Sequence, residues 1–150
     1  MTDNFTFKEL TNSEEHPELV EANRESAKGF IKQLRYTAGT LEEIRDVVKV
    51  RLKVSSGFRN NALNKAVGGS STSGHTRGLC ADIKPLDGMS VEEAFKLIQA
   101  NRDKCPSLKK CIYENIGSRK WLHIETKTEA SQPQQFFTTS NGKTYTEIKA

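Results

Sequence analysis

The fold and chemistry of this chain are constrained most strongly by one stretch, Ser73-Gly74-His75-Thr76-Arg77-Gly78-Leu79-Cys80-Ala81-Asp82. Six residues separate His75 from Asp82, and Gly78 between them permits a sharp turn. A loop of this length can fold back so that the imidazole and the carboxylate point at the same ion. The Gly- and Ser-rich run over 68–74 leads straight into His75, which is typical of a functional loop.

A second segment, Trp121-Leu122-His123, supplies another imidazole 41 positions after Asp82. Around it, apolar residues alternate with Trp121, His123 and Glu125, which predicts a strand with one buried face and His123 on the other. Two imidazoles and one carboxylate suit a zinc ion and leave its fourth position free for water, as in catalytic sites. One formal negative charge leaves the centre positive and able to polarise a carbonyl. The pattern therefore predicts one catalytic Zn²⁺ per chain.

Length and composition indicate one domain spanning residues 1–150. The chain has 150 residues, 35% of them hydrophobic, with no apolar run near the ~18–20 residues that span a bilayer. We therefore expect no membrane insertion. The N-terminal residues lack a basic and apolar signal sequence, so synthesis in the cytoplasm without a signal peptide is expected. Three cysteines with no CxxC pair argue against a disulfide scaffold.

The net charge of +4 indicates attraction to polyanions in general. Basic residues are scattered among acidic ones, and no Arg/Lys stripe with interleaved aromatics is present, so we expect no nucleic-acid partner. An anionic cell-wall polymer suits the charge equally well. A monomer is the default expectation.

Residue patterns along the chain predict an α+β fold, with N-terminal helices packed on a mostly antiparallel sheet. We expect a first, extended segment over 3–12, and the helix pattern breaks at Gly39-Thr40. The expected helices cover about 17–35, 40–48, 61–66 and a stretch capped by Ser90. The expected strands cover about 51–55, 81–83, 110–114 and 121–126, followed by a hairpin over 135–148 that turns at Asn141-Gly142.

Five linked motifs carry a family resemblance: Ser56-Gly57-Phe58-Arg59, Leu63-Asn64, Val67-Gly68-Gly69, the Ser73–Asp82 stretch and Trp121-x-His123. Over about residues 5–126 they resemble the zinc D-Ala-D-Ala carboxypeptidases and related murein endopeptidases, most closely the short peptidase modules of phage lysins. The resemblance implies the fold shared with hedgehog domains and D,D-dipeptidases. It also implies that His75, Asp82 and His123 bind zinc.

The general base departs from the common family pattern. Many members carry the catalytic acid three residues before the second His, where this chain has Lys120. Glu114, which ends the segment Lys110-Cys111-Ile112-Tyr113-Glu114, matches the position used by another branch, so the resemblance assigns it as the base. Glu125, on the same strand face as His123, is the alternative.

Three further residues are expected to contact substrate. Arg59 follows Ser-Gly-Phe at a strand end, and its guanidinium suits binding of a carboxylate or of the oxyanion formed at the cleaved carbonyl. Ser73 resembles the family serine that contacts substrate or orients the metal site. Trp121 is a candidate wall of the cleft, with packing as the alternative.

Together these features predict a zinc peptidase that hydrolyses a peptide bond in the stem or cross-link peptides of bacterial peptidoglycan. The alternative is a non-catalytic, zinc-containing cell-wall-binding module of the same fold. The expected site of action is the cell wall, reached after release through a separate phage membrane pore.

Overall fold

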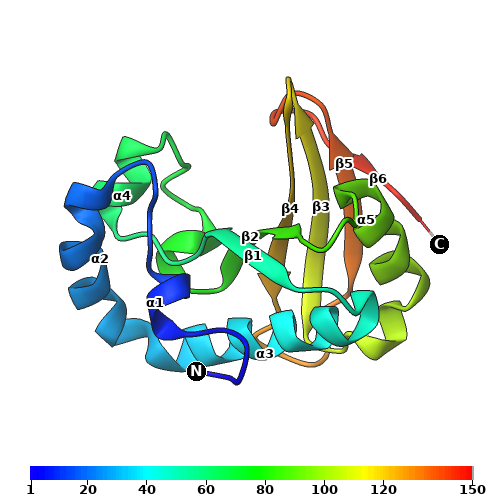
Figure 1. The fold of residues 1–150 in the computed structure, drawn as a ribbon, viewed down its shortest axis with the longest axis horizontal. Coiled ribbons are helices and arrows are strands. Elements are labelled where there is room, and N and C mark those ends of the chain that lie inside the picture. The colour runs from blue at the N-terminus through cyan, green and yellow to red at the C-terminus, as the bar shows by residue number, and fades with distance from the viewer. Residues whose placement is uncertain (150) are drawn as a thin grey trace.

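The computed structural model describes residues 1–149 and contains a mixed six-stranded sheet (Figure 1). The strand order is β1-β2-β4-β3-β5-β6, and every neighbouring pair is antiparallel except β3 and β5, which are parallel. This confirms the predicted α+β class and the mostly antiparallel sheet. The strands are β1 (Leu52–Ser56), β2 (Cys80–Pro85), β3 (Leu108–Ile116), β4 (Arg119–Thr126), β5 (Gln135–Thr139) and β6 (Thr146–Glu147).

The helices are concentrated in the N-terminal half, with α3 running below both the N-terminal helices and the sheet (Figure 1). Among residues 1–149, no helix is both long and apolar enough to cross a bilayer. The α-helices are α1 (Phe7–Leu10), α2 (Val20–Ala27), α3 (Ile31–Val48), α4 (Asn61–Ala66) and α5 (Val91–Ala100). The 3-10 helices are η1 (Pro17–Leu19), η2 (Lys28–Phe30), η3 (Gly74–Arg77) and η4 (Arg102–Lys104).

The predicted helix break at Gly39-Thr40 is wrong. The helix breaks instead at η2, and α3 continues through Gly39 and Thr40 to Val48. A glycine inside a helix costs only about 1 kcal/mol, so packing overrides it. Thr40 is fully buried, and its hydroxyl bonds to the Tyr36 carbonyl one turn back and to Thr126 on β4.

The predicted extended segment over 3–12 is also wrong in part. Thr6 caps the single-turn helix α1 through a capping box with Glu9, which satisfies backbone donors that the short helix would otherwise leave free. The alternation of Phe5 and Phe7 therefore reflects the approach to a helix rather than a strand. The short helix α4 and the helix α5, which Ser90 caps, begin where the sequence predicts.

The two faces of the sheet have different roles. One face forms the core with α3 and α5, and Ile83, Leu122 and Ile124 on this face are fully buried. Since side chains alternate along a strand, Asp82 and His123 project from the opposite face. The apolar face therefore fixes the register that brings the polar side chains of β2 and β4 together.

Candidate metal centre

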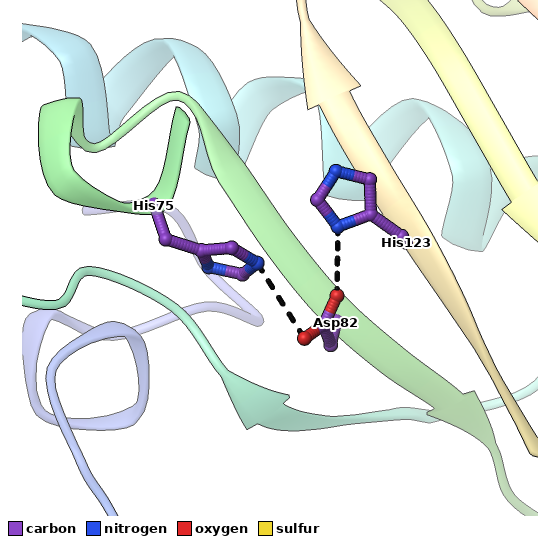
Figure 2. Close-up of side chains that lie close together, drawn as sticks. All are labelled: His75, Asp82 and His123. Atoms are coloured by element: carbon purple, nitrogen blue, oxygen red, sulfur yellow. Dashed lines mark hydrogen bonds and ion pairs between the residues drawn. The ribbon is translucent and has the colours of Figure 1, made fainter. Parts of the chain in front are cut away.

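Three side chains from separate elements meet at Asp82 (Figure 2). His75 comes from η3, Asp82 from β2 and His123 from β4. The Nε2 atom of His75 lies 3.4 Å from Oδ2 of Asp82, and Nδ1 of His123 lies 2.9 Å from Oδ1. The structure thus brings together the three residues that the sequence predicts as ligands.

Loop geometry fixes His75. The Ser73 hydroxyl accepts a hydrogen bond from the backbone N–H of His75 at 3.2 Å, which caps η3. Gly78 ends η3 with a φ of 73°, a left-handed conformation that favours glycine. The imidazole is buried, and its Nδ1 lies 2.7 Å from the Gly57 carbonyl oxygen. Nδ1 therefore carries the proton in the neutral ring, and Nε2 is left as a metal ligand facing Asp82.

Sheet register fixes His123. It lies directly opposite Asp82 across the antiparallel pair β2–β4. Its Nε2 lies 3.1 Å from Oε2 of Glu125, two residues further along the same face of β4. In both histidines, the nitrogen away from Asp82 has an oxygen partner, and the other nitrogen faces Asp82. This is the pattern of metal-binding histidines, whose second nitrogen usually donates to a carbonyl or carboxylate, so the residues fit a zinc ion.

The electrostatics of the cluster favour a cation. Burial alone would raise the pKa of Asp82, but His75 and His123 lower it far below its ordinary value. Burial likewise opposes charge on His123, yet its hydrogen bonds, that to Asp82 foremost, raise its pKa well above the ordinary value. The carboxylate is thus held in its ionised, metal-binding form, and a positive charge is stabilised beside it.

A second grouping of possible ligands shares His123 and adds Cys80 and Glu125. Cys80 is buried, and burial raises the pKa of its thiol, which disfavours the thiolate that binds metals. Glu125 lies at Nε2 of His123, whereas Asp82 lies at Nδ1. We therefore assign the His75, Asp82 and His123 cluster as the candidate metal centre and Glu125 as a partner of His123.

The centre lies in a groove with two arms that both include Asp82, Arg59 and Trp121. We call the larger one, of about 1040 Å³, the wide arm; its lining includes His75, Glu114, His123, Phe137 and Tyr145. We call the smaller one, of about 390 Å³, the narrow arm; its lining includes Glu14, Glu15, Lys53, Lys84 and Arg119. The two arms therefore meet at Asp82, beside the candidate metal centre.

Glu114 projects into the wide arm from β3, where it lies directly opposite Trp121 on β4. Burial raises the pKa of its carboxyl, and the negative charge of Asp82 raises it further, whereas His123, the neighbouring Trp121 side chain and Arg59 oppose the shift. A carboxylate with a raised pKa beside a metal centre suits a general base. Glu125, the alternative base, is instead paired with His123 and lies 3.9 Å from Lys110.

Two donors at the junction of the arms lack acceptors. Within residues 1–149, Nε of Arg59 and Nε1 of Trp121 are buried and have no hydrogen-bond partner. Burial lowers the pKa of Arg59, although the guanidinium stays charged and Asp82 favours that charge. Buried donors without partners are costly in a folded protein, so Arg59 is placed to meet an acceptor on a ligand, and Trp121 an acceptor on a ligand or on the neighbouring Glu114 carboxylate.

Several residues at the site carry no motif that sequence reasoning could use. Asn23, buried on α2, donates to the carbonyls of Thr11 and Phe58, and its oxygen accepts the N–H of Asn60. These bonds hold the loop that carries Arg59. Phe137 and Tyr145 line the wide arm from the C-terminal strands and their connection. Only strand alternation in the C-terminal segment could have indicated Phe137.

An α+β fold with two imidazoles, a carboxylate and a further acid in one groove has the arrangement of a mononuclear metallohydrolase. A family model described as Peptidase M15 matches residues 4–125, and the chain belongs to this family. Membership implies a zinc-dependent peptidase, and the candidate ligands lie within the matched range. No curated protein gives a significant match to the chain.

Proposed function

We propose that this chain is a zinc peptidase, either a carboxypeptidase or an endopeptidase, that cleaves a peptide bond in bacterial peptidoglycan. The observation that carries the proposal is the convergence of His75, Asp82 and His123, with the second nitrogen of each imidazole already engaged. These three residues would hold the ion. When bound, zinc supplies a Lewis acid that activates water and polarises the carbonyl.

Glu114 has the role of general base. Its carboxylate takes a proton from the attacking water and delivers it to the amine that leaves as the peptide bond breaks. The raised pKa supports this role, because a carboxyl with a pKa closer to neutrality is a better proton carrier. Glu125 acts through His123 instead, as a positioning residue.

Arg59 and Trp121 bind the substrate. The Arg59 guanidinium meets a substrate carboxylate or the oxyanion at the cleaved carbonyl, and the Trp121 N–H donates to a substrate oxygen. Their buried and unpartnered donor atoms support both assignments. Ser73 lines the wide arm, where its hydroxyl accepts from the His75 N–H and holds the histidine loop, and its own O–H can donate to substrate.

The groove and the charge support the choice of substrate. Because two arms meet at the metal centre, the groove has room for substrate residues beyond those at the cleaved bond. The net charge of +4 favours adsorption to an anionic cell wall.

Digestion of purified peptidoglycan, followed by mass spectrometry of the released fragments, tests the proposal. We expect new peptide ends with the zinc-loaded chain and none after chelation or with Glu114→Gln. Restoration of activity by added zinc distinguishes metal removal from irreversible unfolding. Zinc binding and wall adsorption without any released fragment would instead identify a non-catalytic binding module.

A further inference from the structure

The narrow arm has a floor of like charges. Lys53 on β1 lies directly opposite Lys84 on β2. Like charges at opposed positions of an antiparallel pair cost some stability, and they concentrate positive charge in this arm. Arg119 adds a third cation at the rim of the same arm, and Arg59 a fourth at its junction with the metal centre.

The acidic side chains of the narrow arm neutralise only part of the positive charge of these four cations. Glu14 lies 3.1 Å from Lys53, and Glu15 lies 3.8 Å from Arg119. All four side chains are well exposed, and exposed ion pairs of this kind contribute little to stability. Lys84, between them, forms no ion pair with any acid in the described part of the chain. An incoming anion therefore finds one free cation, the Lys84 ammonium, and two cations that are weakly held, the Lys53 ammonium and the Arg119 guanidinium.

The position of Lys84 sets where that anion lies on a substrate. Lys84 follows Asp82 by two residues on β2, so both side chains project from the same face, about 6.6 Å apart along the strand. A substrate peptide extended along the groove advances by a similar distance over two residues. An acidic group two positions from the cleaved bond would thus reach Lys84 while the bond lies at the metal centre.

We propose that the narrow arm is a subsite for a substrate carboxylate, with Lys84 as its principal cation and Lys53 as a second. The substrate class is a peptide with a free carboxylate about two residue positions from the bond that is cleaved. This inference rests on the proposed function, because it takes the metal centre as the place of cleavage.

A peptidoglycan stem peptide with free carboxylates, and versions in which each carboxylate is converted in turn to a carboxamide, provide the probes. Binding to the full zinc-loaded chain is measured by the fluorescence of Trp121, the one tryptophan in the sequence, which lines both arms. Glu114→Gln serves as the background so that peptide is not consumed. The variants on it are Lys84→Gln and the matched control Lys104→Gln, an exposed lysine that lines neither arm.

Conversion of one particular peptide carboxylate to the carboxamide should weaken binding by about 5- to 20-fold when Lys84 is present. The same conversion should weaken binding by less than about 2-fold in Lys84→Gln. Lys104→Gln should behave like the background chain. Equal losses with and without Lys84 would overturn the subsite. Cleavage of the free stem peptide by the wild-type chain, measured in parallel, tests the proposed function separately. If the stem peptide is cleaved but amidation weakens binding equally with and without Lys84, only the subsite proposal is contradicted. If the peptide is neither bound nor cleaved, both the subsite and the proposed function are contradicted.

Discussion

The Nδ1 atom of His123 lies 2.9 Å from Oδ1 of Asp82, its directly opposed partner in the β2–β4 ladder. Two atoms bound to one tetrahedral zinc ion at about 2.0–2.1 Å lie about 3.3 Å apart. The 3.4 Å between His75 Nε2 and Asp82 Oδ2 already matches this spacing. Sheet register therefore places His123 beside Asp82, while the two imidazoles face different oxygens of the Asp82 carboxylate. On zinc binding, the hydrogen bond between His123 and Asp82 would give way to the wider spacing of two ligands on one ion.

Zinc affinity should depend on Glu125, although it is not a predicted ligand. Its carboxylate fixes the ring of His123 through Nε2, and loss of such a partner typically lowers metal affinity by about 10- to 100-fold. We expect this loss in Glu125→Ala and a smaller one in Glu125→Gln, measured by competition with a chromophoric chelator. The control is Glu129→Gln, an exposed acid that lines neither arm. Unchanged affinity in Glu125→Ala would show that His123 needs no such support.

Glu114→Gln should separate catalysis from folding. Peptide cleavage should fall by about 10²–10⁴-fold, because the variant keeps the shape of the side chain but cannot accept a proton. Burial penalises the ionised Glu114, so the metal-free variant should melt at the same temperature as wild type or a higher one at neutral pH. Turnover close to wild type would instead direct attention to Glu125.

The acid limb of kcat/KM should follow Glu114. The base acts only when ionised, so activity should fall as the pH drops through its folded-state pKa, which burial places above the ordinary value. The profile is measured with saturating zinc, and zinc occupancy is determined at each pH. A rate that stays constant as the pH falls through the carboxylate range, with zinc still bound, is incompatible with this assignment.

Arg59→Lys should not rescue Arg59→Ala. An ammonium group lacks the planar fork of the guanidinium, so both variants should lose about 30- to 1000-fold in kcat/KM. Melting temperatures should change little, because the bond to the His75 carbonyl comes from the Arg59 backbone and persists in either variant. A large drop in melting temperature with full activity in the folded fraction would make Arg59 a structural residue.

Local chemistry explains which elements could be predicted. The capping serine of α5 and the alternation around His123 act within a few residues, so their patterns are visible in the sequence. Gly39 and Thr40 misled the prediction because the stability of α3 comes from tertiary packing, including the contact between Thr40 and Thr126. Propensity at a single position cannot reveal such a contact.

The candidate site likewise has features that the sequence indicates and features that only the structure reveals. The spacing of His75, Asp82 and His123 indicates a metal centre, and the structure brings these side chains together. The bonds of Asn23 to the Arg59 loop and the opposition of Lys53 and Lys84 join residues 31 or more positions apart. Such pairings depend on chain packing and strand register, which no local pattern specifies.

Anomalous diffraction at the zinc absorption edge, from crystals of the zinc-loaded chain, tests the central claim most directly. The account predicts one peak per chain, bound by Nε2 of His75, the Asp82 carboxylate and Nδ1 of His123. A peak among Cys80, Nε2 of His123 and Glu125, or no peak in crystals grown with equimolar zinc, would contradict it.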